Sequence, residues 1–504
     1  MRRAAALLLI CWACDDAAPM VVLPGLVAVS GSAPWNSAAC RGPVGRSGVP
    51  FANAEVEPFA AVDPGNPKHL IGIWQQDRWS NGGASGLVTA ATFDGGHTWT
   101  TSFAKFTRCS GGTFQRASDP WVGISPNGTA YQIGYAFDED APNRAMLVSR
   151  SMDGGRSWET PIALQQDGDP DFIMDKETLT ADPLDAQLAY AVWDRLTGTT
   201  VVNNPQATGP TWFARTVDGG ASWEPARAIY DPGVDAQTIS NQIAVLPDGT
   251  LVNLLLLITQ NSSMSPKATI AVLRSPDHGV TWSGPFNVAE AGFVGVADWK
   301  TGRGIRTGSV VPSIAVDRSS GALYIAWEDA RFSGMMRDGI ALSWSTDGGL
   351  QWSAPVQVNG AHDVPAFTPT VAVGAAGKLG VTYYDLREDN PADLAHLMAT
   401  HWLAISTDGG ATFAETKIAG PFDVHGAPLV DGAAWFLGDY QALPAAGADF
   451  LPFFVAVPGG GPSNVFFRPA DAATAASSLT VAARGVQQMW RGARERWRFG
   501  TLFK

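Results

Sequence analysis

The stretch Ser345-Thr346-Asp347-Gly348-Gly349-Leu350-Gln351-Trp352 has the pattern Ser/Thr-x-Asp-x-Gly-x-x-aromatic. In a tight hairpin, the Asp carboxylate can accept hydrogen bonds from turn amides, and the Gly can adopt a positive φ angle. The aromatic ring can pack under the turn. The stretch therefore predicts a hairpin between two β-strands.

This pattern occurs six times, at intervals of about sixty residues. The other copies are Thr92 to Trp99, Ser151 to Trp158, Thr216 to Trp223, Ser275 to Trp282 and Ser406 to Phe413. A fixed period of this length is typical of chains built from copies of one structural unit. The sequence therefore predicts a repeat protein.

A second recurrent pattern lies upstream of each copy, and it consists of an apolar segment, a turn and another apolar segment. Its first copy begins at Pro58, turns at Pro64 to Pro67 and continues from Leu70 to Trp74, which predicts two paired strands. Further copies begin at Pro120, Thr178, Gln242, Pro312, Pro369 and Tyr440. The copy at Tyr440 has no Asp-containing hairpin after it.

The repeated hairpins are identified as Asp-boxes, and the chain resembles the sialidase-like β-propellers over nearly its whole length. The resemblance implies an all-β fold, and we predict a seven-bladed β-propeller. In the last blade, the third strand would be Asn464 to Arg468 and the fourth would be the N-terminal run Val21 to Val29. Closure by this strand would hide exposed sheet edges. The alternative is a six-bladed sialidase propeller with the last repeat as an extension.

Composition agrees with an exported all-β protein. The chain has 504 residues, with 55 Gly, 34 Pro, 19 Trp and 16% charged residues. The net charge of −13 argues against nucleic acid as a partner, because phosphate binding needs a basic surface. We expect a monomer with a signal at residues 1–20, the propeller at 21–470 and a tail at 471–504.

The N-terminus has the features of an export signal. Met1-Arg2-Arg3 precedes a short apolar run from Ala4 to Ala13. Cys14 resembles a bacterial lipoprotein processing site, so the alternatives are membrane attachment through a lipid on Cys14 and simple signal cleavage. We predict a periplasmic, cell-surface or extracellular protein. The basic, aromatic C-terminal tail either is solvated or contacts a membrane or a partner.

Two cysteines remain after the signal, Cys40 and Cys109. In an oxidising compartment an even pair favours a disulfide, and the alternative is two unrelated buried thiols. Seven histidines are present, but none has zinc-site spacing, and Asp167, Asp169 and Asp171 do not complete a calcium loop of the EF type. The sequence therefore predicts neither a metal nor a cofactor.

Charged residues are concentrated before the first strand and after the second strand of each repeat. Antiparallel pairing places both positions at the same end of a sheet, so we expect these residues to meet at one mouth of the ring. The Asp-boxes lie at the other end. Their carboxylates are already used by the turn, so we predict a structural role for them. These residues are Asp94, Asp153, Asp218, Asp277, Asp347 and Asp408.

The resemblance also implies a set of catalytic groups. Sialidases as a family bind a carboxylate with three arginines, use a tyrosine activated by a glutamate as nucleophile, and use an aspartate as acid/base. By their place at the mouth, the candidate arginines are Arg78, Arg116, Arg195, Arg306, Arg331 and Arg387. The candidate nucleophile is Tyr440 or Tyr384, which could also contact the substrate. The candidate base is Glu57 or Glu177, and the candidate acid is Asp119 or Asp77. Trp74, Trp193, Trp327 and Tyr384 would supply an apolar face for a sugar.

One family motif is missing. The Phe/Tyr-Arg-Ile-Pro segment, which carries the first arginine, is absent, and the comparable stretch is Val56-Glu57-Pro58-Phe59. Asp77-Arg78 and Asp194-Arg195 could instead be ion pairs that link neighbouring repeats. Two functions therefore remain open. One is an exported glycoside hydrolase of sialidase type acting on terminal acidic sugars, and the other is a non-catalytic propeller that binds a glycan or a protein.

Overall fold

The computed structural model describes residues 25–35, 47–197, 208–260, 266–430 and 434–470. In these ranges the regular elements are β-strands and short 3-10 helices, so the fold is all-β. The 3-10 helices are η1 (Arg108–Ser110), η2 (Arg331–Ser333), η3 (Ala375–Gly377), η4 (Val424–Gly426) and η5 (Pro458–Gly460). None of the described helices has the length and apolar character needed to cross a membrane.

Six four-stranded antiparallel units follow one another along the described chain. They are β2 (Glu55–Asp63), β3 (Asn66–Arg78), β4 (Ala84–Thr92) and β5 (Thr100–Ser102); β6 (Arg116–Ile124), β7 (Ala130–Phe137), β8 (Arg144–Ser151) and β9 (Ile162–Asp167); β10 (Phe172–Ala181), β11 (Ala189–Thr197), β13 (Thr211–Thr216) and β14 (Arg227–Tyr230); β15 (Ala236–Val245), β16 (Leu251–Gln260), β17 (Pro266–Ser275) and β18 (Ser283–Ala291); β21 (Ser313–Val316), β22 (Leu323–Asp329), β23 (Gly339–Ser345) and β24 (Val356–Gln357); β25 (Ala366–Val373), β26 (Leu379–Asp385), β27 (Met398–Ser406) and β28 (Ala414–Asp423). In every unit the Asp-box begins at the last residue of the third strand.

A further sheet joins the two ends of the described chain. Its strands are β33 (Phe453–Ala456), β34 (Asn464–Phe467) and β1 (Val27–Ala28), with β34 in the middle. Val27 pairs with Phe467, and Ala442 forms an isolated bridge with Phe453. Strand β1 therefore lies beside the C-terminal repeat, within the N-terminal run that the sequence analysis assigned to this sheet.

The remaining strands are short additions to this plan. The strands β19 (Val296–Ala297), β20 (Gly304–Arg306), β30 (Ala434–Phe436) and β29 (Leu429–Val430) form a small sheet in which β20 and β30 are parallel. Strand β12 (Thr208–Gly209) pairs with β15, and β31 (Ala445–Ala446) pairs with β32 (Asp449–Phe450). The small sheet brings two insertions together, one before β21 and one before β33.

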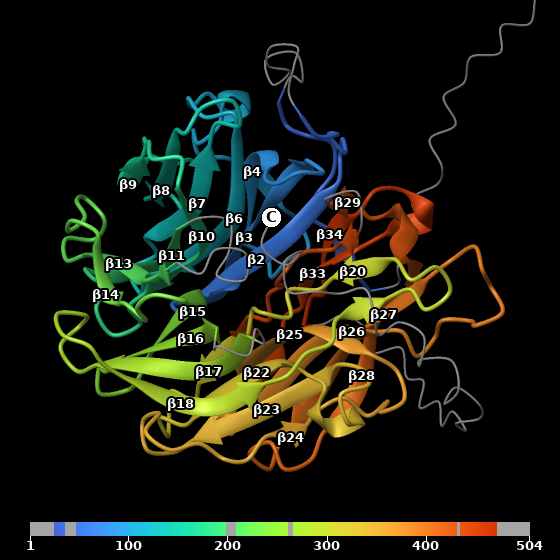
Figure 1. The fold of residues 1–504 in the computed structure, drawn as a ribbon. Coiled ribbons are helices and arrows are strands. Elements are labelled where there is room, and N and C mark those ends of the chain that lie inside the picture. Colours follow the sequence, from blue (N-terminus) through green and yellow to red (C-terminus); the bar gives the residue numbers. More distant parts are fainter. Residues whose placement is uncertain (1–24, 36–46, 198–207, 261–265, 431–433, 471–504) are drawn as a thin grey trace, which may run out of the picture.

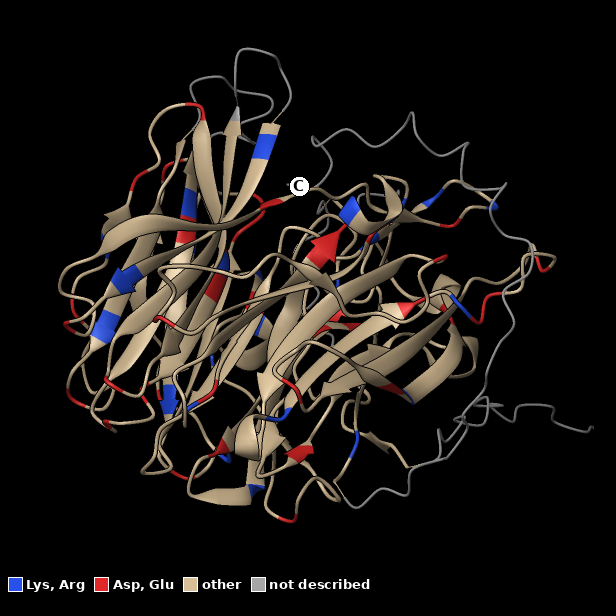
Figure 2. Ribbon diagram, turned by 90° about the horizontal axis from the view of Figure 1, so that it is seen from below, with Lys and Arg blue, Asp and Glu red and all other residues tan. Residues whose placement is uncertain are grey.

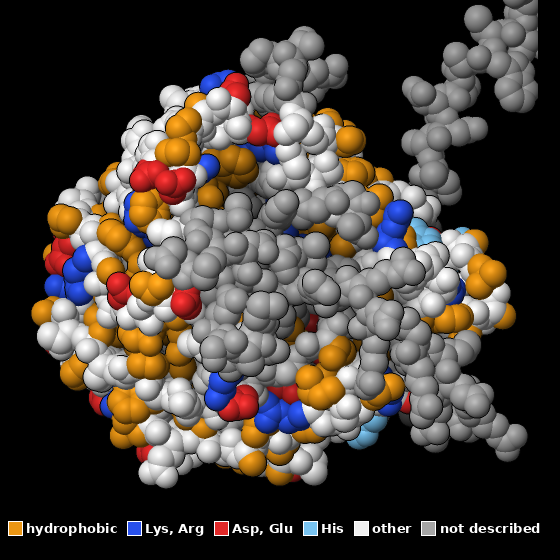
Figure 3. Space-filling view, viewed as in Figure 1, with side chains coloured by type: hydrophobic (Ala, Val, Ile, Leu, Met, Phe, Trp, Pro, Cys, Tyr) orange, Lys and Arg blue, Asp and Glu red, His pale blue; other side chains and the backbone are white. Residues whose placement is uncertain are grey.

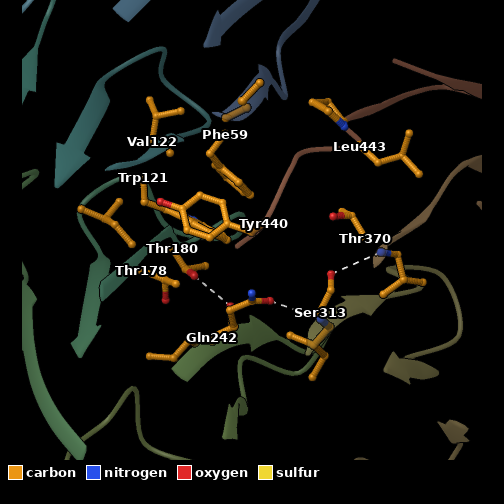
Figure 4. Close-up of a pocket in the computed structure, with 18 of the residues that line it drawn as sticks. Phe59, Trp121, Val122, Thr178, Thr180, Gln242, Ser313, Thr370, Tyr440 and Leu443 are labelled. Carbon is orange, nitrogen blue, oxygen red and sulfur yellow. Dashed lines mark hydrogen bonds between the residues drawn. The ribbon is translucent and has the colours of Figure 1, made fainter. Parts of the chain in front are cut away.

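The sheets surround a central channel. Figure 1 shows that they succeed one another in chain order, and β33 contacts β2 where the last sheet meets the first. The channel has a volume of about 310 Å³ and is lined by β2, β6, β10, β15, β21, β25 and the segment around Tyr440 (Figure 4). This arrangement is consistent with a β-propeller.

Side chains tie neighbouring inner strands to one another. The Thr180 hydroxyl donates to the carbonyl of Ile243 at 2.8 Å, and the Thr370 hydroxyl donates to the carbonyl of Gln441 at 2.9 Å. The Ser313 hydroxyl accepts from the amide of Val371 at 3.2 Å. Because adjacent first strands are not joined by a continuous β-ladder, these bonds hold the channel wall together.

The Asp-box turn has the hydrogen bonds that its sequence predicts. The Asp347 carboxylate accepts from the amide of Gln351 at 3.0 Å and from the Ser345 hydroxyl at 2.8 Å. The Ser345 hydroxyl accepts from the amide of Gly349, where φ is +89°, and the Trp352 indole donates to the Gly349 carbonyl at 3.1 Å. The Asp347 turn therefore satisfies its polar groups within eight residues, whereas the Trp158 indole of the second box donates to Thr89 and Ser102 in the neighbouring unit.

Candidate functional site

Five first strands carry a β-bulge at the same position, at the end opposite the Asp-boxes. In each bulge one residue that is not glycine has a positive φ, a conformation that is uncommon and is concentrated at functional sites. These residues are Glu57 at 52°, Asp119 at 51°, Lys176 at 53°, Ser240 at 63° and Thr368 at 51°. The bulges therefore mark the mouth, and three of them present charged side chains.

The three charged bulge residues meet at one point. The Lys176 Nζ lies 2.6 Å from Asp119 Oδ1, 2.6 Å from Asp439 Oδ2 and 3.3 Å from Glu57 Oε1. None of these four residues is more than 5% exposed. One buried lysine therefore holds carboxylates from three different parts of the chain.

Two arginines adjoin this cluster, and both contact one aromatic ring. Arg306 forms a two-point ion pair with Asp439, with its Nε 2.9 Å from Oδ1. Arg78 Nη1 donates to Gln75 Oε1 at 2.8 Å, and the Gln75 amide donates in turn to Glu57. The guanidinium carbons of Arg78 and Arg306 lie 5.0 and 4.9 Å from the centre of the Phe436 ring. The two cations therefore contact the same aromatic ring beside the cluster.

Arg78 differs from the other cations of the cluster. Its side chain is only 3% exposed, yet no described carboxylate lies within ion-pair distance of it. Its Nε is buried and has no hydrogen-bond partner in the structure. A buried cation normally has a paired anion, because removing an isolated charge from water is costly. Arg78 therefore points to an anion that the described protein groups do not supply.

The charges of the cluster follow from burial and from the ion pairs. Burial raises the pKa of Glu57 to about 8, and repulsion from Asp119 acts in the same direction. Burial alone would also raise the pKa of Asp439, but Arg306 and Lys176 hold that pKa well below its ordinary value. At neutral pH, Glu57 is thus protonated, and Asp439 is ionised between Arg306 and Lys176. Asp175 is a further buried carboxyl beside Lys176 and Arg306, and burial raises its pKa to about 6.

Tyr440 lies beside this cluster without a glutamate partner. Its hydroxyl donates to the carbonyl of Pro120 at 3.0 Å, and its ring packs edge-on against Trp121 with 5.3 Å between the ring centres. Burial raises the pKa of Tyr440 well above its ordinary value, and Glu57 and Asp119 add to the shift. The predicted tyrosine and glutamate pair is therefore not formed at Tyr440. Tyr384 is fully buried, with its hydroxyl donating to the carbonyl of Val455.

Four of the six predicted arginines do not join Arg78 and Arg306. Their carboxylate partners are Glu139 for Arg116, Asp167 for Arg195, Asp329 for Arg331, and Asp385 with Glu415 for Arg387. Arg116 begins β6, Arg195 lies in β11, and Arg331 and Arg387 follow the second strands β22 and β26, so nearby acidic residues bind each of them. Three converging arginines are thus not present among the described residues.

The other predicted acids also have structural partners. Glu177 accepts from the backbone amide of Tyr135, and Asp77 accepts from the amide of Asn53 and the indole of Trp35. Neither Asp77-Arg78 nor Asp194-Arg195 is an ion pair. Asp194 instead accepts from the amide of Ser240 at 2.9 Å, in the next unit. The prediction of ion pairs at these two positions was therefore wrong, although Asp194 does connect two neighbouring units through a backbone amide.

The aromatic residues expected to receive a sugar are part of the core. Trp74, Trp193 and Trp327 are at most 1% exposed. Their indole nitrogens donate to Gln76, Gln165 and Asp329, so each polar edge is satisfied inside the protein. The expectation of an apolar sugar platform at these residues was wrong, because second-strand tryptophans pack between sheets instead of facing the mouth.

Lys176, Asp439, Gln75 and Phe436 complete the site but were not among the predicted site residues. A sequence signal existed for Lys176, because it has the same position in its repeat as Glu57 and Asp119, and all three are in the bulges of first strands. No sequence pattern indicated Phe436, because it reaches the mouth on the small sheet in which strands from two distant insertions pair.

The box aspartates lie away from this cluster. Hydrogen bonds from Thr412 and Ser406 lower the pKa of Asp408 to about 2, and equivalent bonds lower the pKa of Asp218. Figure 2 shows acidic residues in turns around the periphery of the molecule. Around the rim of the face seen in Figure 3, side chains of both signs alternate with apolar ones.

Metal and disulfide candidates are few in the described ranges. There, no group of three or more His, Cys, Asp or Glu side chains is arranged to hold a metal ion. Asp167, Asp169 and Asp171 form successive turns in which each of the first two accepts from the amide of the next. Cys109 is disulfide-bonded. Cys40 and Cys14 lie outside the described residues, so pairing with Cys40 and lipidation of Cys14 stay predictions.

Comparison with known proteins gives structural similarity only. No protein-family model and no curated protein matches the sequence. The Hadza microbial sialidase Hz136 is 15% identical, over 80% of this chain and 73% of that chain, with a TM-score of 0.46. The leech intramolecular trans-sialidase is 11% identical, over 83% and 91%, with a TM-score of 0.42. The Penicillium chrysogenum alpha-L-arabinanase is 12% identical, over 71% and 94%, with a TM-score of 0.43.

Proposed function

We propose that this protein acts on glycans at the mouth of a β-propeller and receives an acidic sugar there. The observation that carries the proposal is Arg78, a buried guanidinium without a carboxylate partner among the described residues. A guanidinium matches a carboxylate in charge and planar geometry. The six Asp-boxes, which resemble those of sialidase-like propellers, support the choice of a sugar as the carrier of that carboxylate.

Binding is better supported than hydrolysis of sialidase type. That reaction needs three converging arginines and a tyrosine paired with a glutamate. The described mouth holds Arg78 and Arg306, and its tyrosine donates to a backbone carbonyl. A specific observation nevertheless favours a glycosidase as the second candidate. Glu57 is protonated at neutral pH, which is the state that a general acid needs to protonate a leaving group.

The architecture and location belong to the same proposal. We infer seven blades, of which the last is β33, β34 and β1, because seven inner segments line the channel. Export follows from the apolar N-terminal run, and an oxidising compartment fits the disulfide at Cys109.

The test measures binding and turnover separately. Isothermal titration with a methyl sialoside and a methyl glucuronide is compared for wild type, Arg78→Gln and Arg150→Gln. Arg150 is the control because it pairs with Glu159 on an outer edge, far from the mouth. We expect Arg78→Gln to weaken binding by about tenfold or more, since a charge-assisted hydrogen bond contributes about 1.5–3 kcal/mol. Arg150→Gln should bind like wild type.

Fluorogenic sialosides and uronides then test hydrolysis in the same proteins and in Glu57→Gln. Turnover by wild type that disappears in Glu57→Gln, with binding retained, would establish the glycosidase. Binding without turnover on any acidic sugar would leave the non-catalytic propeller. If neither probe binds the wild type, the proposed function is wrong.

A further inference from the structure

The cavity in the central channel is separate from the charged mouth cluster. Its lining residues follow the bulges of the first strands, as with residues 59–62 of β2, 121–124 of β6 and 178–181 of β10. Among the described residues that line the cavity, none belongs to the charged cluster. The cavity therefore lies between the bulges and the turns that follow the first strands.

Three aromatic rings lie where the cavity approaches the mouth. Phe59, Trp121 and Tyr440 line the cavity, and each follows a carboxylate of the mouth by one or two residues. Phe59 stacks on Trp121, which packs edge-on against Tyr440. The Lys176 Nζ lies 5.9 Å from the centre of the Tyr440 ring. Figure 4 shows the three rings gathered on one side of the cavity, so they form an apolar floor between the cavity and the mouth cluster.

The cavity opens at the end that is opposite to the mouth. At the floor, Tyr440 is 6% exposed and Trp121 is 8% exposed. Val62, further along β2, is half-buried, whereas Pro64 and Arg318 are exposed in the turns after β2 and β21. Exposure thus rises along the lining from the rings to the turns, and a ligand would enter from the turn end.

Arg318 is the charged residue at this opening. Within the described ranges, its guanidinium forms no hydrogen bond and no ion pair. The two nearby acids are bound by other groups. Asp182 accepts from the Tyr190 hydroxyl at 2.7 Å, and Asp317 accepts from the Ser319 hydroxyl at 2.7 Å. The N–H groups of Arg318 are therefore available as donors to a ligand in the cavity.

The walls between the rings and Arg318 are apolar surfaces with occupied hydroxyls. The hydroxyls of Thr178, Thr180 and Thr370 all line the cavity and donate to backbone carbonyls of the neighbouring segment. Val122 and Leu443 add apolar surface. A ligand that fits this pattern has an apolar body and carries its hydrogen-bond acceptor at the end near Arg318.

We propose that the cavity is a second ligand site, which binds a small organic acid with its apolar body against the three rings and its carboxylate on Arg318. A guanidinium can bind a carboxylate through two parallel hydrogen bonds. The cavity volume of about 310 Å³ is at the small end of ligand pockets, which suits one ring with a short chain. The site does not depend on the acidic-sugar function, because that function concerns Arg78 at the mouth.

A series of aryl acids tests the site. Phenylacetate, 3-phenylpropionate and 4-phenylbutyrate place the carboxylate at three different distances from the ring. Ligand-observed NMR titrations compare each acid with its uncharged primary amide. We expect the wild type to bind at least one acid about tenfold more tightly than its amide, because only the acid forms a charge-assisted pair with Arg318.

Two arginine variants test the carboxylate contact. Arg318→Gln should lose the preference for the acid over the amide. Arg156→Gln is the matched control, because Arg156 is an exposed arginine in an Asp-box turn that contacts Phe93 and does not line the cavity. Arg156→Gln should bind like the wild type. An unchanged preference in Arg318→Gln overturns the proposed contact.

Two valine variants test the location. Val62 and Val373 are half-buried near the ends of the first strands β2 and β25, but of the two only Val62 lines the cavity. Val62→Trp should fill the open part of the cavity and weaken binding at least tenfold, whereas Val373→Trp should bind like the wild type. Melting temperatures check that both variants are folded, and the arginine variants test the site independently of them.

Three further results would overturn the second site. If the wild type binds none of the three acids, the cavity does not receive ligands of this class. If a folded Val62→Trp binds the acid as tightly as the wild type, the acid lies elsewhere. If Arg78→Gln weakens binding and Arg318→Gln does not, the acid occupies the mouth.

Discussion

The carboxylates at the two ends of each repeat have hydrogen-bond partners at very different distances along the sequence. At the Asp-box end, Asp347 is satisfied by groups no more than four residues away. At the mouth, Lys176 is held by Asp119, 57 residues away, and by Asp439, 263 residues away. The Asp carboxylates at the first end are bound within their own turns, and the second end is one network that exists only when distant strands meet. The same repeat therefore builds scaffold at one end and a shared polar site at the other.

Removing the central cation of the mouth should have the largest effect. Lys176→Met leaves Asp119 and Asp439 buried with one cation fewer, and breaking a buried ion pair costs about 3–5 kcal/mol. Urea unfolding would measure this loss. Lys267→Met is the matched control, since its partner Glu290 is exposed, and its stability should be unchanged. If Lys176→Met is as stable as Lys267→Met, then Lys176 does not stabilise the carboxylate network.

The coupling free energy between pairs of mutations should differ between the mouth and the Asp-box end. In a double-mutant cycle, Glu57→Gln and Lys176→Met should couple by about 1–3 kcal/mol, because the two side chains share one network. Asp94→Ala and Asp347→Ala belong to different boxes and should add within about 0.5 kcal/mol. Strong coupling between the two boxes would contradict the view that each turn is independent.

Stability should depend on pH in opposite senses at the two ends. Burial raises the pKa of Asp175 to about 6 and that of Glu57 to about 8, so their contribution is complete below about pH 4 and is lost as the pH rises through 6 to 8. Hydrogen bonds lower the pKa of Asp218 and Asp408 to about 2, so their contribution is present above about pH 4 and is lost as the pH falls towards 2.

The melting temperature should therefore be highest between about pH 4 and 6 and lower by a few degrees on both sides. Calorimetric scans of wild type and Glu57→Gln would check this. Glu57→Gln should lose less stability than wild type between pH 5 and 8. A melting temperature that rises steadily from pH 5 to 9 would be inconsistent with protonated carboxyls in the mouth.

The sequence predicted those features of the protein that depend on local hydrogen bonds and on the spacing of the repeat. The Asp-box turn has its predicted bonds because every donor and acceptor lies within one eight-residue stretch. The placement of β34 and β1 in one sheet could also be anticipated, since a repeat without its own fourth strand needs one from elsewhere. Charged residues before first strands indicated the mouth, and Glu57, Asp119, Arg78 and Arg306 do meet there.

The rest of the site could not be read from the order of residues. Arg195 and Arg387 have the same placement in their repeats as Arg78, yet nearby acids bind them, while Arg78 keeps its charge. That outcome depends on which acids fold back onto each arginine. Trp74 was expected at the mouth, and it lies in the core because of the direction in which its strand faces.

By itself, the sequence determined the repeat, its hairpins and the end of the sheets at which charge gathers, because those features depend on spacing and local hydrogen bonds. Only the tertiary structure decided which charges are paired, which proton stays on Glu57 and which cation is left over. Charge states in a buried cluster depend on burial and on distances between residues hundreds of positions apart, and only the closed arrangement of the sheets sets those distances.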